Sequence, residues 1–252
     1  MKYFLSELKY SFNNLVTNSN QNYVQAYNEL KEKGFVIVEN FISKDNAAEL
    51  RKEIDYYLKK DYSWNDNAGS DGRVYGIERV SDLFKNLFKN EKLHYLYSKY
   101  IDAKNCNEFI MANRVEYKEG NLGSGGGWHR DSMNRRQLKF ILYLTDVNEE
   151  SGCFQYIPGT HKPLEKYRIN KSLSKKLSDP RYSQEEISKL VSNSAYNIED
   201  LIGEQGTLIV VETSGIHRGK PIEKGYVRYA ATNYMSDADF SLGIKANLVK
   251  NK

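Results

Sequence analysis

The hydrophobic pattern of this 252-residue chain changes period near Glu108, and this change limits the folds open to it. In the segment 137–146, every second residue from Leu138 to Leu144 is a leucine or phenylalanine, as in a β-strand. Similar short runs occur at 109–118, before this segment, and at 154–157, 206–212 and 226–234, after it. Turn residues and glycines separate them. Several short strands of this kind predict a sandwich or barrel.

The first hundred residues have a helical pattern instead. Apolar residues recur at helical spacing within 3–16, and a second helix is expected at 22–33. We therefore expect residues 1–33 to form an N-terminal helical extension and residues 34–252 to form one domain. The first helix would pack against this domain or form a homodimer. A membrane-surface helix is the alternative, with only two lysines in its favour.

The region between the extension and the first long strand mixes three patterns. A short buried strand is expected at 35–38, and Ser43 is a suitable N-cap for the helix after it. Residues 62–79 have no clear period and are expected to form a loop. Ser81 can cap another helix, or a pair of helices broken near Asn90.

A lysine- and serine-rich stretch at 163–200 interrupts the strands and is expected to be mostly helical. As an insert of this length it could serve as a lid over a site. A solvated decoration of the surface is the other interpretation. The residues alone do not separate the two.

The charge and cysteine content narrow the possible partners. Thirty-seven basic against 33 acidic residues give a net charge of +4, too mild to indicate nucleic acid. No apolar run approaches the length that spans a bilayer, and the start lacks a signal-peptide core. Cys106 and Cys153 show no pairing signature. We therefore expect a cytoplasmic protein with a small-molecule partner.

The segment Gly123-Ser-Gly-Gly-Gly-Trp-His129-Arg-Asp131 ends with two metal-capable side chains two residues apart. Residues at this spacing point to the same side of an extended chain. His217, beyond a later apolar run, is a third candidate ligand. Two histidines and one carboxylate leave three coordination positions open, which suits Fe(II) rather than structural zinc. The glycines match no nucleotide-binding fingerprint, so we expect a flexible rim beside the metal.

In these segments the sequence resembles the phytanoyl-CoA dioxygenase family of Fe(II)/2-oxoglutarate oxygenases, over roughly Lys33 to Met235. A His-x-Asp pair is a weak pattern by itself. The order of the motifs makes the resemblance fairly specific: 34–43, 128–131, 149–162, then His217 followed by Arg228. The resemblance implies a double-stranded β-helix (a jelly roll, or cupin-like core) with flanking helices. It places the metal, held by His129, Asp131 and His217, inside one open end.

The resemblance also implies a cosubstrate site. Arg228 would bind the far carboxylate of 2-oxoglutarate, since a guanidinium gives bidentate geometry. It shares a strand face with Ala230 and Thr232, and Thr232 is a weaker candidate for a second contact. A surface-strand arginine is the alternative for Arg228. Arg218 follows a ligand histidine directly, so it should point elsewhere.

The implied reaction uses O2 to decarboxylate 2-oxoglutarate to succinate and to hydroxylate, or otherwise oxidise, a C–H bond of a small metabolite. Related halogenating enzymes have a small residue at the position of Asp131, so the aspartate favours oxidation. Two other functions stay open. One is a non-oxidative cupin-type metal enzyme such as an isomerase, and the other is a non-catalytic protein that binds metal and 2-oxoglutarate.

The sequence says least about the substrate. Basic residues near the metal segments could meet an anionic group or could face solvent: Arg114, Arg130, Arg135, Arg136, Lys139 and Lys162. Three aromatic residues could wall the pocket or fill the core: Tyr117, Trp128 and Tyr143. His161 is expected to be a structural hydrogen-bonding residue rather than a fourth ligand.

Overall fold

The computed structural model describes residues 19–103, 106–133, 135–176, 178–192 and 196–250. Its strands form a seven-stranded sheet, ordered β1-β8-β5-β10-β4-β3-β2, and a three-stranded sheet, ordered β7-β6-β9. Every pairing between these strands is antiparallel. The strands are β1 Phe35–Val38, β2 Trp64–Asn65, β3 Asp71–Tyr75, β4 Asn107–Glu116, β5 Leu138–Tyr143, β6 Phe154–Tyr156, β7 Glu199–Leu201, β8 Leu208–Glu212, β9 His217–Gly219 and β10 Val227–Ser236.

The two sheets pack face to face. Ile141, Tyr143 and Ile209 of the large sheet share a buried cluster with Tyr156 and Leu201 of the small one. Two antiparallel sheets in this arrangement form the core of a jelly roll. The predicted mainly-β fold with flanking helices is therefore confirmed.

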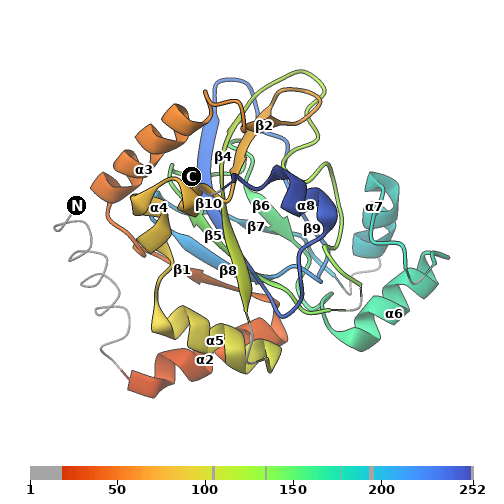
Figure 1. Cartoon of the computed structure of the whole chain (residues 1–252). Coiled ribbons are helices and arrows are strands. Elements are labelled where there is room, and N and C mark those ends of the chain that lie inside the picture. Colours follow the sequence, from red (N-terminus) through yellow and green to blue (C-terminus); the bar gives the residue numbers. More distant parts are fainter. Residues whose placement is uncertain (1–18, 104–105, 134, 177, 193–195, 251–252) are drawn as a thin grey trace.

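Helices cover the other face of the large sheet and the far side of the small one (Figure 1). The first group is α2 Ser19–Glu32, α3 Lys44–Tyr57, η1 Ile77–Arg79, α4 Asp82–Leu87 and α5 Glu91–Ile101. The second group is α6 Pro163–Ser172 and α7 Gln184–Ser192, and the short α8 spans Leu242–Asn247. The chain alternates across β5 as predicted. Leu138, Phe140 and Leu142 pack under the first group, and Ile141 and Tyr143 face the small sheet.

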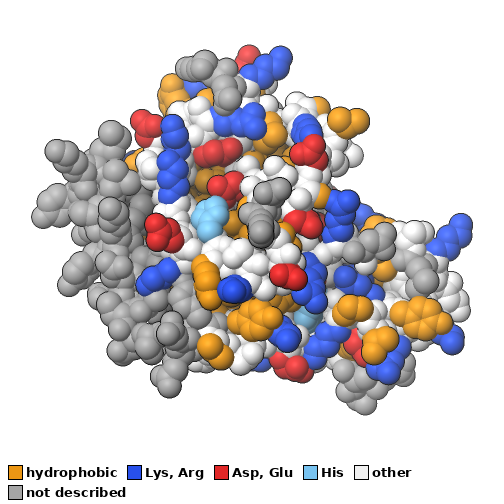
Figure 2. Space-filling view, turned by 60° about the horizontal axis from the view of Figure 1, so that its bottom comes forward, with side chains coloured by type: hydrophobic (Ala, Val, Ile, Leu, Met, Phe, Trp, Pro, Cys, Tyr) orange, Lys and Arg blue, Asp and Glu red, His pale blue; other side chains and the backbone are white. Residues whose placement is uncertain are grey.

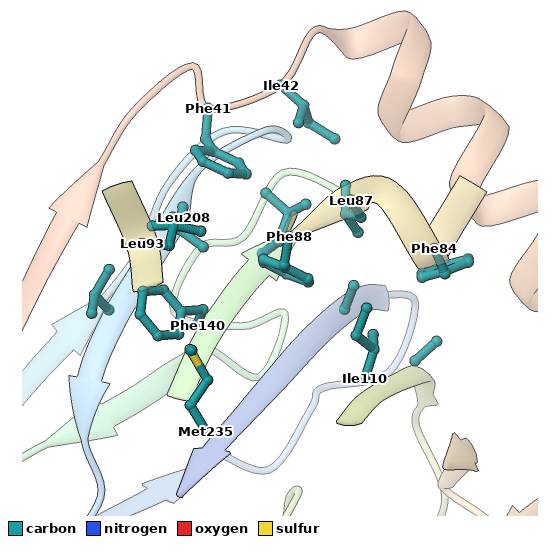
Figure 3. Close-up of a cluster of buried hydrophobic side chains, with 14 of the residues drawn as sticks. Phe41, Ile42, Phe84, Leu87, Phe88, Leu93, Ile110, Phe140, Leu208 and Met235 are labelled. Carbon is teal, nitrogen blue, oxygen red and sulfur yellow. The ribbon is translucent and has the colours of Figure 1, made fainter. Parts of the chain in front are cut away.

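Capping side chains fix the predicted helix starts. Ser43 accepts a hydrogen bond from the amide of Asn46 at the start of α3. Ser81 caps α4 and Asn90 caps α5, so the helix pair breaks where the sequence predicts. The main apolar cluster fills the space between these helices and the sheet, and Figure 3 shows Phe140 beside Leu208 and Met235 within it.

Other predictions differ from the structure. The expected loop at 62–79 is wrong, because it contains β2, β3 and η1. Strand β3 is largely buried, but two of its residues, Asp71 and Arg73, are polar and pair with each other. Its sequence therefore shows no hydrophobic alternation. The second helix begins at Ser19 rather than at residue 22. The mostly helical stretch expected at 163–200 contains α6 and α7, and β7 begins at its end. The helix predicted at 3–16, and the homodimer through it, lie outside the described residues.

Basic and acidic side chains do not form separate patches on the face shown in Figure 2 but are interspersed. Within the described part of the chain, no helix combines the length and apolar character needed to cross a membrane.

Phe140 tests the packing of the sheet against the helices. It lies on β5, between β8 and β10 in the large sheet, and is fully buried. We expect Phe140→Ala to lower the free energy of unfolding by about 3–5 kcal/mol, because the cavity it leaves can close only partly. Urea denaturation measures this value. Leu242→Ala is the matched control, since Leu242 is 84% exposed, and it should change little. A loss below about 1 kcal/mol for Phe140→Ala would contradict this packing.

Candidate active site

The glycine-rich loop before His129 folds as only glycines readily can. Gly123, Gly125, Gly126 and Gly127 all have positive φ, between 70° and 90°. A Cβ at Gly123 would collide with the carbonyl of Gly219, and one at Gly125 would collide with the ring of His129. The loop therefore packs closely against β9, which carries His217, and against the ring of His129.

Backbone pairing brings the three predicted metal ligands together. The amide of His129 donates to the carbonyl of His217, and the amide of His217 donates back, both at 2.9 Å. The amide of Asp131 donates to Thr213 at 2.9 Å. One ligand atom from each of His129, Asp131 and His217 lies within 4.8 Å of the others. The three side chains therefore lie close together, as the sequence predicts.

The hydrogen bonds of the two imidazoles fix their tautomers. His129 Nδ1 lies 2.8 Å from the carbonyl of Gly127, and His217 Nδ1 lies 2.9 Å from that of Gly215. A carbonyl can only accept, so each Nδ1 is the protonated nitrogen, and in the neutral imidazole the lone pair is then on Nε2. Both Nε2 atoms face Asp131 Oδ1, at 3.6 and 3.9 Å. His217 Nε2 is buried and has no hydrogen-bond partner among the described residues. A metal ion would satisfy it.

The charge states also fit a divalent metal. Burial alone would raise the pKa of the Asp131 carboxyl, but Lys139 and the two histidines hold it well below its usual value. Burial, followed by the neighbouring His129, lowers the pKa of His217 well below that of a free imidazole. The site thus presents a carboxylate and a neutral imidazole, the forms that bind metal.

A cavity of about 670 Å³ opens beside this triad. Its floor is the inner face of the large sheet, and β10 contributes Arg228, Ala230, Thr232 and Tyr234. The prediction that Arg228, Ala230 and Thr232 share one face is confirmed. Arg228 is 5% exposed and donates to the carbonyl of Gly152. Its Nε has no partner among the described residues.

Most of the basic residues considered as substrate contacts do not serve the cavity. Arg114 pairs with Asp55 and Glu116, Lys162 pairs with Glu32, and Arg136 donates to a backbone carbonyl. Arg135 is exposed. Arg130 borders the cavity, but its guanidinium turns away to the Tyr182 hydroxyl and the carbonyls of Thr160 and Ser214. Lys139 lines the cavity.

Of the remaining aromatic and histidine candidates, one lines the cavity and the others lie outside it. Tyr143 lines the cavity, Tyr117 is exposed, and Trp128 packs in an apolar cluster beneath the insert. The guanidinium of Arg218 lies 4.5 Å from the Trp128 ring, so it points elsewhere, as predicted. His161 lies outside the triad, and its Nε2 is 3.2 Å from the carbonyl of Lys31. The prediction of a structural role is confirmed.

Sequence reasoning missed the wall that β3 contributes. Asp71 is buried, pairs with Arg73, and accepts hydrogen bonds from Asn113 and Ser124. Arg73 also donates to the Tyr75 hydroxyl at 2.8 Å. The signal in the sequence was the i, i+2 spacing of Asp71, Arg73 and Tyr75, which places all three on one strand face.

The insert also contributes to the site. The amide of Arg130 donates to Pro180, and the amide of Tyr182 donates to Trp128. Arg181 donates to the carbonyls of Gly125 and Gly126 in the glycine-rich loop. Pro180 and Arg181 are part of the cavity wall. That the insert moves as a lid stays a prediction.

Comparison with known proteins identifies the family. A family model described as phytanoyl-CoA dioxygenase (PhyH) matches residues 30–224. The chain is 21% identical over 148 residues to ectoine dioxygenase of Halomonas elongata, and 24% identical over 212 residues to that of Nocardia farcinica. The matches cover 52% and 73% of this chain, but only 44% and 67% of those relatives.

A solved structure shows the same fold. The epimerase SnoN from nogalamycin biosynthesis, crystallised with Fe3+, alpha ketoglutarate and nogalamycin RO, superposes with a TM-score of 0.65 at 17% identity. The superposition covers 87% of this chain and 85% of SnoN. Because the family model matches well over half of the sequence, the chain belongs to the phytanoyl-CoA dioxygenase family.

Proposed function

We propose that the protein is an Fe(II)/2-oxoglutarate-dependent oxygenase that hydroxylates, or otherwise oxidises, a C–H bond of a small molecule. The observation that carries the proposal is the triad, in which the free nitrogen of His217 is buried without a partner and faces Asp131. In this proposal His129, Asp131 and His217 hold the metal from one side. Three coordination positions then stay open toward the cavity.

Arg228 is proposed to bind the far carboxylate of 2-oxoglutarate. It is buried at the cavity wall, and its Nε has no partner among the described residues. Ala230 leaves space beside it, and the Thr232 hydroxyl lies two residues further on the same face for a second contact. Bound Fe(II), 2-oxoglutarate and O2 supply the oxidation, with release of succinate and CO2.

The chain's own contribution is to bind, orient and exclude water. Tyr143, Phe154 and Ile141 line the cavity, and they limit water around the cosubstrate. The backbone pairing of His129 with His217 fixes the metal ligands before any ligand binds. Such preorganisation is what places a substrate carbon near the reacting centre.

The two other functions carry less support. A non-oxidative cupin-type isomerase needs no anchor for a dicarboxylate, so Arg228 in the cavity favours the oxygenase. A non-catalytic binding protein would need no complete triad. Asp131 as a third ligand favours hydroxylation over halogenation.

We further propose that the enzyme works in the cytoplasm, where Cys106 and Cys153 stay free thiols as in the structure.

Removing either histidine tests the metal site. We expect His129→Ala and His217→Ala each to abolish stoichiometric Fe(II) binding under anaerobic conditions, because the triad supplies all the protein ligands. Equilibrium dialysis with metal analysis measures the bound fraction. His94→Ala is the control, because this half-exposed residue lies beside Glu108 and away from the triad. Full Fe(II) binding by a triad variant would remove that residue from the site.

Removing Arg228 tests the cosubstrate site. Anaerobic titration of the Fe(II)-loaded protein with 2-oxoglutarate should produce the weak visible charge-transfer band of a keto acid chelated to Fe(II). Arg228→Ala should weaken 2-oxoglutarate binding by about 2–3 kcal/mol while Fe(II) binding is kept, because a charge-assisted pair is lost.

Two controls make the Arg228 result specific. Arg228→Lys keeps the positive charge but loses the paired donors of the guanidinium. Its affinity for 2-oxoglutarate should therefore lie between those of the wild-type protein and Arg228→Ala. Arg114→Ala, on the outer face of the same sheet, should leave the titration unchanged. Absence of the band in the wild-type protein with metal bound would favour the isomerase or the binding protein. Unchanged affinity in Arg228→Ala would place the anchor elsewhere.

A further inference from the structure

Lys139 is a buried ammonium beside the metal centre that is neither a proposed metal ligand nor the proposed anchor for the cosubstrate. It lies on the inner face of β5, is 8% exposed and lines the cavity. Its Nζ lies 2.7 Å from Asp131 Oδ2 and 4.4 Å from the centre of the Tyr234 ring. Among the described residues, Asp131 is its one ion-pair partner.

The Asp131 carboxylate divides its oxygens between two tasks. Oδ1 faces the free nitrogens of both histidines, and Oδ2 accepts from Lys139. An ammonium has three donors, and a buried charge is costly unless it is paired. Asp131 takes one of these donors. The others can be satisfied from the cavity, which Lys139 borders.

The other cations around the cavity are already engaged. Arg73 pairs with Asp71, Arg181 donates to the glycine-rich loop, and Arg130 donates to backbone carbonyls and Tyr182. Arg228 is the proposed anchor for 2-oxoglutarate. Arg130 keeps one buried donor, Nη2, without a partner among the described residues, while its Nε and Nη1 donate to the groups just named. Lys139 is the cation that lies against Asp131 and still has donors for another ligand.

Charge balance favours an anion as that ligand, and this step rests on the proposed function. A divalent metal, Lys139 and Arg228 bring four positive charges. Asp131 and 2-oxoglutarate bring three negative ones. One positive charge is left, and Arg130, which borders the cavity and donates only to neutral groups, adds another. Unbalanced charge at partly buried groups is unfavourable.

The register of the sheet separates Lys139 from the proposed anchor. Lys139 pairs with Tyr234, six residues along β10 from Arg228. At about 3.3 Å per residue, their backbones lie roughly 20 Å apart along the strand. Tyr234, whose ring lies beside Lys139, packs in one cluster with Tyr75, Met111 and Ile244, and all four line the cavity. Arg73, which is paired with Asp71, lines the cavity as well. An anion held by Lys139 would have its carbon skeleton against the side chains of this cluster.

We propose that Lys139 determines substrate specificity by binding a carboxylate or phosphate group of the substrate beside the metal centre. The adjacent carbons then lie between the triad and the apolar side chains of β3, β4 and β10. Lys139 also holds Asp131 so that Oδ1 alone faces the metal.

A pair of probes that differ only in charge tests this proposal. The protein, loaded anaerobically with Fe(II) and 2-oxoglutarate, is titrated with butyrate, with butyramide and with inorganic phosphate, by calorimetry and by the visible band. We expect butyrate or phosphate to bind the wild-type protein at least about tenfold more tightly than butyramide. Tighter phosphate indicates a phosphorylated substrate, and tighter butyrate indicates a carboxylic acid.

Lys139→Gln removes the charge while its amide can still donate to Asp131. This variant should lose the preference for the anion but keep Fe(II), 2-oxoglutarate and the band. Lys139→Arg keeps the charge and should retain part of the preference. Lys189→Met, which removes an exposed lysine of α7, should behave like the wild type.

Three results would overturn the proposal for Lys139. The first is equal binding of butyrate and butyramide by the wild-type protein, and the second is an unchanged preference in Lys139→Gln. The third is a loss of 2-oxoglutarate affinity in Lys139→Gln without a change in anion preference, which would assign Lys139 to the cosubstrate. The band reports separately on the proposed function. If the wild type lacks it, the same comparison on Zn(II)-loaded protein still decides whether Lys139 selects an anion.

Discussion

The reciprocal hydrogen bonds between the backbones of His129 and His217 are the constraint on which the site depends. They join the end of the glycine-rich loop to β9, which belongs to the small sheet. The imidazoles follow, with ring centres 4.4 Å apart. Backbone pairing brings the two histidines together, and the carbonyls of Gly127 and Gly215 orient their rings. The glycines then matter as the residues that let the loop approach the His129 ring.

The sequence could predict the features that local chemistry determines. Alternation along 137–146 predicts β5, and Ser43 and Asn90 predict two helix starts, because each rests on nearby residues. The triad could also be predicted, since His-x-Asp fixes two ligands by spacing. The third, His217, needed the order of motifs across the family. Its approach to His129 is a long-range pairing that no local pattern encodes.

What could not be predicted depends on partners distant in sequence. Strand β3 carries Asp71 and Arg73 at buried positions, and they are tolerated there because each is paired with the other and with Ser124. Charged residues in a short segment with several glycines indicate a loop, so the pattern favoured the wrong answer. The insert presents the same difficulty. Its composition indicates a solvated surface, yet Arg181 lies against the glycine-rich loop beside the metal site.

Asp131 connects these observations, because one carboxylate lies between two cationic sites. Its Oδ1 faces the imidazoles, and its Oδ2 faces Lys139. A carboxylate that donates electron density to an ammonium is a weaker metal ligand than a free one, so the lysine has a cost for metal affinity. In return, Lys139 fixes the orientation of the Asp131 carboxylate. A carboxylate held at Oδ2 presents a single oxygen to the metal and leaves the open coordination positions to ligands from the cavity. The ammonium keeps Asp131 ionised, and Asp131 takes only one of its three donors. The remaining donors are available to whatever enters the cavity.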